Sequence, residues 1–205
     1  FNGTNNIEIT QNSSIQTSTF SVGLWIKGYP QGGTTILENG GVNGFTIKTG
    51  TSGSYGHIQG RIGNGSAAPS ITDALNGEWN FIFFTFSSYL RRSSNGVYVS
   101  GAGTGTLSYD SSKGLFIGSD SSSSNGFVGE IAQVVYYDNR GPNTAGTLYG
   151  NLPANPPPSP LTGEANPNLV SWWKLDAASI TDSNGSNNGT NNGATLIDTN
   201  VGRPA

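Results

Sequence analysis

The sequence contains neither cysteine nor methionine. Without cysteine the chain can form no disulfide framework, thiolate nucleophile or thiolate metal site. Both sulfur-containing side chains are readily oxidised. Their absence therefore suits a protein that is exposed outside the cell.

Charge and long hydrophobic runs are also scarce. Charged residues make up 10% of the chain, the net charge is -3 and the isoelectric point is near 4.9. Nucleic-acid binding needs a concentrated basic patch, so it is not expected, and we interpret the pair Arg91-Arg92 as a solvated turn. No run approaches the roughly 18 apolar residues of a membrane span, so no membrane insertion is expected. No signal peptide is visible, and a start at Phe1 indicates a processed or trimmed N-terminus.

Glycine and aromatic residues are abundant instead, with 31 glycines and 10% aromatic residues in 205 positions. Apolar residues alternate over 20–27, which indicates a half-buried strand. The run 79–86 is apolar on both faces and should lie centrally in a sheet covered on both sides. Further short strand patterns give about ten strands joined by tight turns, with almost no helix beyond one short turn at 144–148. This pattern predicts one β-sandwich or jelly roll.

The last fifth of the chain contains a strand pattern with no neighbour in sequence. Trp172 and Trp173 stand side by side, after a proline-rich tract that includes Asn155–Pro160. A strand with two indoles must bury at least one face. We therefore predict a main body at 1–151, a proline-rich spacer at 152–168, and a strand and loop segment at 169–205 that completes a sandwich.

Several motifs resemble the laminin-G-like members of the concanavalin A-like lectin/glucanase superfamily. The segment 129–140 is similar to the family's last strand, and Phe1–Thr4 is similar to its Phe-Asp-Gly segment. The Trp-x-Leu-Asp at 173–176 and the Asn-Gly-rich loop at 182–189 are similar to its first strand and the following loop. The resemblance implies an all-β fold, a two-sheet antiparallel jelly-roll sandwich.

The order of these motifs is rotated relative to the family, because its first strand stands here at the C-terminal end. Joining Ala205 to Phe1 would restore the usual order. The chain is therefore circularly permuted and closes its own sandwich, or is one repeat of a tandem array, or is strand-exchanged with a neighbouring subunit. In each case Trp172, Trp173 and Leu175 are the predicted strand-closure or assembly residues, and the predicted partner of the two tryptophans is the sheet that contains 127–137.

Catalytic motifs are hard to find. Glycosidases need paired carboxylates across the scissile bond, and the scattered glutamates show no such pattern. His57 is the single histidine, so a Ser-His-Asp triad would have to use it. We therefore expect no enzyme, and keep a glycan-active enzyme as the least favoured alternative.

One loop has a composition that suits a hard cation. Asp182, Asn184 and Asn187 crowd a few positions and offer the oxygen ligands that calcium prefers. The resemblance implies the same cofactor, because members of the family often hold structural calcium. Asn and Gly also occur in such loops because they tolerate the left-handed conformation of tight turns. Asp73, Asp120 and Asp138 are further candidates.

Tyr29, Tyr55 and Tyr109 stand in loop-like contexts and are the predicted glycan contacts, because exposed aromatic rings stack against sugars. The sequence thus favours a non-enzymatic structural or adhesive module, located outside the cell, on a cell surface or on a virion. Its expected partners are copies of itself and surface glycans. The alternative is a soluble, calcium-dependent lectin domain.

Overall fold

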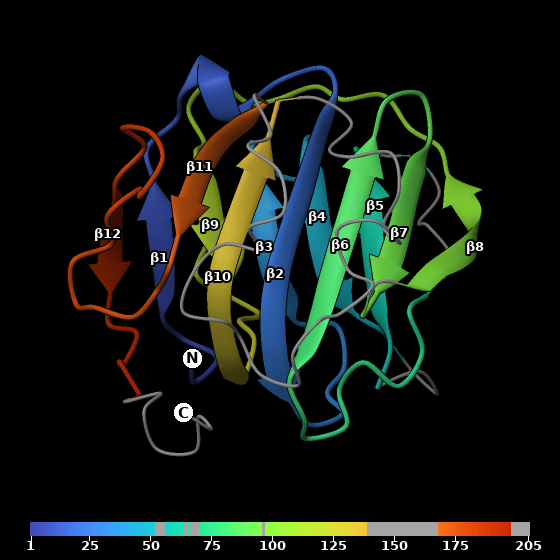
Figure 1. Cartoon of the computed structure of the whole chain (residues 1–205), viewed down its shortest axis with the longest axis horizontal. Coiled ribbons are helices and arrows are strands. Elements are labelled where there is room, and N and C mark those ends of the chain that lie inside the picture. Colours follow the sequence, from blue (N-terminus) through green and yellow to red (C-terminus); the bar gives the residue numbers. More distant parts are fainter. Residues whose placement is uncertain (52–55, 64, 66–69, 96, 139–167, 198–205) are drawn as a thin grey trace.

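The computed structural model describes residues 1–51, 56–63, 65, 70–95, 97–138 and 168–197, which form two antiparallel sheets packed face to face (Figure 1). One six-stranded sheet has the order β12-β1-β9-β3-β4-β5, and the other has the order β11-β10-β2-β6-β7-β8. The strands are β1 (Asn6–Ile9), β2 (Phe20–Gly28), β3 (Thr35–Asn39), β4 (Phe45–Thr49), β5 (Ile58–Ile62), β6 (Asn80–Phe86), β7 (Leu90–Ser94), β8 (Val97–Gly103), β9 (Leu115–Ile117), β10 (Gly129–Tyr137), β11 (Leu169–Trp173) and β12 (Gly189–Asn192). A single turn of 3-10 helix, Ser13–Ile15, follows β1. The predicted all-β jelly-roll sandwich is confirmed.

The main core lies between the inner faces of the two sheets. Alternate residues of β2 point into it, and Phe20, Val22 and Leu24 are completely buried. The facing sheet contributes residues such as Leu37 and Ile117, which are neighbours across β3 and β9. Burial of so many apolar side chains is the main force that holds the two sheets together.

A second aromatic cluster lies on the outer face of the sheet that contains β2 and β6. It consists of Trp25, Phe81, Phe83 and Ala132, all nearly buried. Since β6 lies between β2 and β7, the prediction that the run 79–86 is central and apolar on both faces is confirmed. A glycine is required between these rings, because a Cβ atom at Gly23 would lie 2.7 Å from the Phe81 ring.

Two predictions about local structure were wrong. The pair Arg91-Arg92 forms part of β7 rather than a solvated turn, and Arg92 is buried. The Asn-rich stretch after Asp182 contains β12, where sequence analysis expected only a loop. Both strands lack the apolar alternation that reveals a strand in sequence, and each forms by pairing with a well-defined neighbour. The predicted turn at 144–148, and the spacer except for Asn168, lie outside the described residues.

The described C-terminal residues 168–197, called the closing segment below, close both sheets at the same side of the sandwich (Figure 1). β11 pairs with β10, with Trp173 opposite Val134, and β12 pairs with β1, with Thr190 opposite Glu8. β11 thus lies beside the strand that the sequence indicated as the partner of the two tryptophans. Among the described residues no helix has the length and hydrophobicity to span a membrane.

Candidate functional site

The loop between β11 and β12 is organised around the carboxylate of Asp182. Its Oδ1 atom accepts hydrogen bonds from the backbone N–H groups of Trp172, Asn184 and Gly185, each at 3.0 Å. Its Oδ2 atom accepts one from the N–H of Asn187 at 3.1 Å. One side chain therefore ties the loop to the outer edge of β11, which would otherwise expose unpaired backbone groups.

These N–H donors also set the charge state of the site. Burial raises the pKa of the Asp182 carboxyl, but the backbone hydrogen bonds outweigh this effect and hold the pKa below its usual value. Hydrogen bonds to a carboxylate favour the charged form in this way. The loop is therefore held by an ionised Asp182 at neutral pH.

The neighbouring asparagines use their amide groups as donors. Asn184 donates to the carbonyl oxygen of Leu169 at 2.6 Å, and Asn187 donates to the hydroxyls of Ser14 and Ser171 at 3.0 and 2.8 Å. A calcium ion needs oxygen atoms directed at it, whereas here N–H groups surround the Asp182 carboxylate. No group of three or more acidic, His or Cys side chains suited to a metal occurs in the described part of the chain. Calcium at this loop stays a prediction.

The two adjacent tryptophans face opposite sides of β11. Trp173 is completely buried in the core, and its indole N–H donates to the carbonyl oxygen of Asn187 at 2.6 Å. Trp172 lies on the outer face, where the Lys174 ammonium sits 4.6 Å from the centre of its ring. Trp173 therefore anchors the closing segment, whereas Trp172 faces outward.

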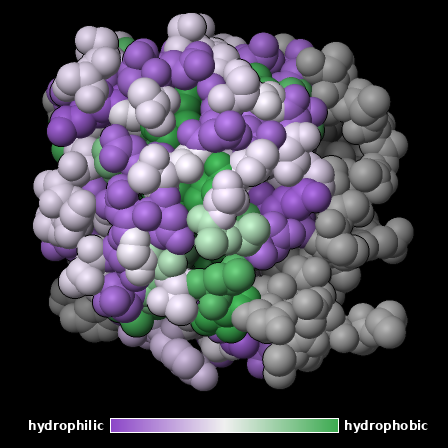
Figure 2. Space-filling model, turned by 90° about the vertical axis from the view of Figure 1, so that its left-hand side faces the viewer, coloured by the Kyte–Doolittle hydropathy of each residue, from purple (hydrophilic) through white to green (hydrophobic). Residues whose placement is uncertain are grey.

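Next to this anchor, a groove runs along the boundary between the closing segment and the body of the sandwich. It is shallow and open to solvent, with a volume of about 60 Å³. Trp79 and Phe1 line its aromatic part, and Leu175, Leu196 and Ile197 line its aliphatic part. On the face that includes β11 and β12, Figure 2 shows hydrophobic side chains gathered in the lower half. An open apolar groove with a few polar groups is the usual form of a ligand site.

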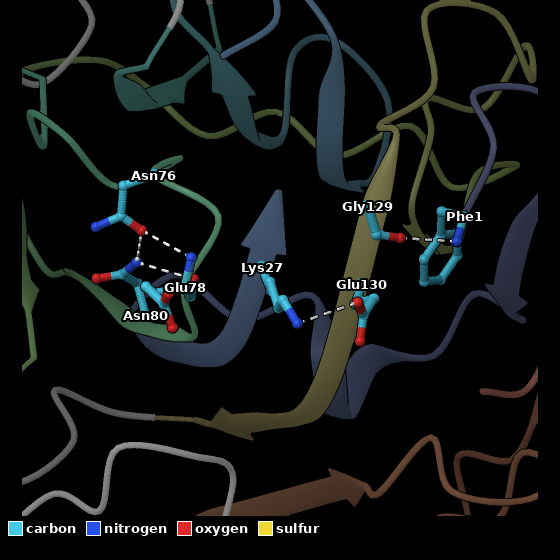
Figure 3. A network of polar contacts seen from close by, with 7 residues as sticks. All are labelled: Phe1, Lys27, Asn76, Glu78, Asn80, Gly129 and Glu130. Carbon is cyan, nitrogen blue, oxygen red and sulfur yellow. Dashed lines mark hydrogen bonds and ion pairs between the residues drawn. The ribbon is translucent and has the colours of Figure 1, made fainter. Parts of the chain in front are cut away.

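The polar groups of the groove come from both parts of the chain. Glu130 on β10 and Asp176, Lys174 and Asn191 of the closing segment line it. Glu130 forms an ion pair of 3.7 Å with Lys27 of β2, as Figure 3 shows.

Beside this pair the amino group of Phe1 donates to the carbonyl oxygen of Gly129 at 2.8 Å (Figure 3). A short turn precedes β6 on the same side, where the Asn76 carbonyl oxygen accepts from Asn80 at 3.0 Å. Trp79 stands within this turn, so its backbone is held on both sides. These hydrogen bonds hold the turn that carries Trp79 and the N-terminal residue beside the groove.

Two of the predicted glycan tyrosines, Tyr29 and Tyr109, lie in different surroundings. Tyr29 is 74% exposed and its ring lies over Gly77. Tyr109 packs on Gly40, donates its hydroxyl to the carbonyl oxygen of Thr17 at 3.0 Å, and has its pKa raised by burial. Tyr55 lies outside the described residues. Of the three, Tyr29 alone is seen to present an exposed ring.

Of the predicted closure residues, Leu175 also lines the groove, which the sequence did not indicate. The groove residues Trp79 and Glu130 were not predicted as binding residues. Both lie in predicted strands, where the pattern indicated a role in the fold. The available signal was the exposed polar residue Glu78, which directly precedes Trp79 at the start of the strand pattern.

Comparison with known proteins supports the fold. A solved structure from Bacteroides ovatus, described as a "putative carbohydrate binding protein", is 21% identical, with a TM-score of 0.66 over 94% of this chain and 58% of that chain. The binding domain of botulinum neurotoxin serotype D is 14% identical, with a TM-score of 0.53 over 70% of this chain and 40% of that one. A Trypanosoma rangeli sialidase in complex with sialic acid is 15% identical, with a TM-score of 0.50 over 68% of this chain and 25% of that chain.

The chain spans less than two thirds of the length of each of these structures. No curated protein matches it. The Laminin_G_3 family, described as the concanavalin A-like lectin/glucanases superfamily, matches residues 1–140. This match ends before the closing segment. The chain thus belongs to the concanavalin A-like lectin/glucanases superfamily.

Proposed function

We propose that this chain is a non-enzymatic glycan-binding module that acts outside the cell, on a cell surface or on a virion. The ligand site is the groove between the closing segment and the body. One observation carries the proposal: the partly exposed ring of Trp79 lies in an open groove with Glu130, Asp176 and Asn191.

Sugars present both apolar C–H faces and hydroxyl groups. An aromatic ring offers a flat surface for the C–H face. Carboxylate and amide groups accept and donate hydrogen bonds to hydroxyls. The likeness to the Bacteroides ovatus protein supports this chemistry, since that protein is described as carbohydrate-binding.

Binding is favoured over hydrolysis by the contacts of Glu130. A glycosidase needs two carboxyl groups placed across the scissile bond. Glu130 is instead engaged by Lys27 in an ion pair of 3.7 Å. A glycan-active enzyme is therefore the less favoured alternative.

The test is a glycan array probed with the intact chain, followed by titration of each positive glycan. Trp79→Ala should weaken binding by about 10-fold or more, since loss of an aromatic platform costs one or more kcal/mol. Tyr29→Ala, which changes another exposed ring, is the matched control and should bind normally. Equal affinities of the two variants, or an array without positives, would refute the groove as the site.

Two further measurements separate the alternatives. Repeating the array with a calcium chelator distinguishes a calcium-dependent lectin, in which binding would disappear. Incubating the bound glycans with the chain and analysing the products distinguishes an enzyme, in which fragments would appear. The proposed module retains binding and leaves the glycans intact.

A further inference from the structure

A short motif near the start of the chain has the form that accepts N-linked sugars. Asn2-Gly3-Thr4 follows the pattern Asn-x-Ser/Thr, in which the asparagine amide is the acceptor. The same pattern recurs at Asn12, Asn64, Asn184 and Asn188. The motif at Asn64 lies outside the described residues. Since Asn, Ser and Thr are abundant in this chain, the pattern alone does not choose among the motifs, but the hydrogen bonds of the other four do.

In the first motif the amide and the hydroxyl contact each other. Asn2 and Thr4 are both exposed. The Thr4 hydroxyl donates to the Asn2 Oδ1 atom at 2.9 Å, and the backbone N–H of Thr4 donates to the same atom at 3.1 Å. Asparagine often closes a turn in this way. Within the described chain the Asn2 Nδ2 group has no hydrogen-bond partner. The nitrogen that would bond to a sugar is therefore free, in an exposed residue.

The main chain holds this motif on the surface of the sandwich. The backbone N–H of Gly3 donates to the carbonyl oxygen of Phe127 at 3.2 Å, and the carbonyl oxygen of Gly3 accepts from the N–H of Gly126 at 3.2 Å. Asn2 forms an isolated β-bridge with Val128. Gly3 has a φ of 90°, which glycine adopts without strain. A sugar on the Asn2 side chain would leave all of these backbone contacts in place.

The motif at Asn12 has its polar groups engaged elsewhere. Asn12 Oδ1 accepts the backbone N–H of Ser14 at 2.9 Å and caps the 3-10 turn. The Ser14 hydroxyl accepts a hydrogen bond from the Asn187 amide at 3.0 Å, which ties it to the loop around Asp182. The hydroxyl of this motif therefore already serves to hold the closing segment.

The motifs at Asn184 and Asn188 are part of the same loop. The Asn184 Nδ2 group donates to the carbonyl oxygen of Leu169 at 2.6 Å. The Asn188 Oδ1 atom accepts the backbone N–H of Asp182 at 2.9 Å, and Thr190, the third residue of its motif, lies in β12. Modification of either asparagine would disturb contacts that fasten β11 and β12.

We propose that Asn2 is a modification site, at which the folded chain accepts an N-linked sugar from a glycosyl diphosphate. In the transfer the Asn2 Nδ2 atom forms a bond to C1 of the sugar, and the bond from C1 to the diphosphate oxygen breaks. The diphosphate leaves with the bonding electron pair, and one amide proton passes to a base of the transferase. The sugar then stands at the surface next to Phe1, which lines the groove.

The test offers the intact, folded chain to two transferases in separate reactions. A soluble N-glycosyltransferase is supplied with UDP-glucose, and detergent-opened microsomes supply a lipid-linked oligosaccharide, so the mass of the adduct identifies the donor. Peptide mass spectrometry locates the adduct. We expect sugar on Asn2 in at least one reaction, and none on Asn12, Asn184 or Asn188. A tryptic digest of the chain is the positive control. It should be modified at these other asparagines as well, because proteolysis frees their side chains.

Three variants show whether the motif itself is read. Thr4→Ala removes the hydroxyl and should abolish the modification of Asn2, whereas Thr4→Ser keeps the hydroxyl and should preserve it. Ser14→Ala, which removes the hydroxyl of the Asn12 motif, is the matched control and should leave Asn2 modified as before. Thermal melting followed by circular dichroism checks that each variant is folded.

Three results would overturn the proposal. The first is an Asn2 amide that stays unmodified in the folded chain with both donors. The second is a folded chain in which Asn12, Asn184 or Asn188 is modified as readily as Asn2. The third is modification of Asn2 that persists in the Thr4→Ala chain.

Discussion

The body of the sandwich and its closing segment are held by different forces. In the body, β2 and β6 are apolar on both faces and bury rings such as Phe20, Phe84 and Trp25. In the closing segment, β11 and β12 contribute one fully buried aromatic residue, Trp173, and a network of hydrogen bonds around Asp182. Hydrophobic burial is insensitive to pH, whereas a network around a carboxylate is not. The closing segment should therefore be the part that responds to acid.

The largest effect is expected in the body. Phe84 is completely buried between the sheets and contacts the ring of Phe45 at a centroid distance of 6.0 Å. Phe84→Ala should lower the free energy of unfolding by about 4 kcal/mol through lost burial and a cavity. Urea unfolding followed by circular dichroism measures this change, and Tyr29→Ala serves as an exposed control with an effect below about 0.5 kcal/mol. A loss of less than about 1 kcal/mol for Phe84→Ala would show that this face is not the main core.

A smaller effect is expected at the anchor of the closing segment. Trp173→Phe removes part of a buried ring and the hydrogen bond to Asn187, and should lower the free energy of unfolding by about 2–3 kcal/mol. Trp172→Phe, its neighbour on the outward face, should cost less than half as much. Equal losses for the two variants would contradict the assignment of Trp173 as the anchor.

A third effect depends on pH. The folded-state pKa of Asp182 is lowered, so its contribution to stability is present above the ordinary Asp pKa of about 3.9 and is lost as the pH falls through the folded value. Asp182→Asn should cost roughly 2 kcal/mol at pH 7, because N–H donors lose a charged acceptor. The urea midpoints of the two chains, measured from pH 7 to pH 2.5, should converge in acid. Midpoints that stay equally far apart would contradict the role of the ionised carboxylate.

The body could be predicted from the sequence because its strands contain strong local patterns. The alternation over 20–27 and the apolar run 79–86 reveal both the strands and their burial. β7 and β12 were missed because Arg91-Arg92 and the Asn-rich run carry no such pattern, and pairing with β6 and β1 decides their conformation. Local sequence does not report such long-range pairing.

The candidate sites were harder to predict than the fold. Asp182, Asn184 and Asn187 were grouped correctly in one loop, but composition does not show whether oxygen atoms or N–H groups face inward. Here the N–H groups face the Asp182 carboxylate. The groove joins residues such as Trp79 and Leu196 that are far apart in sequence.

We propose that the closing segment completes the sandwich of its own subunit. The absence of cysteine makes this claim directly testable. Glu8 and Thr190 are opposite each other on β1 and β12, a spacing at which paired cysteines can form a disulfide. The Glu8→Cys, Thr190→Cys chain should oxidise to a monomer with a reducible internal crosslink. Reducible covalent dimers or longer ladders at low protein concentration would show instead that the segment closes a neighbouring subunit.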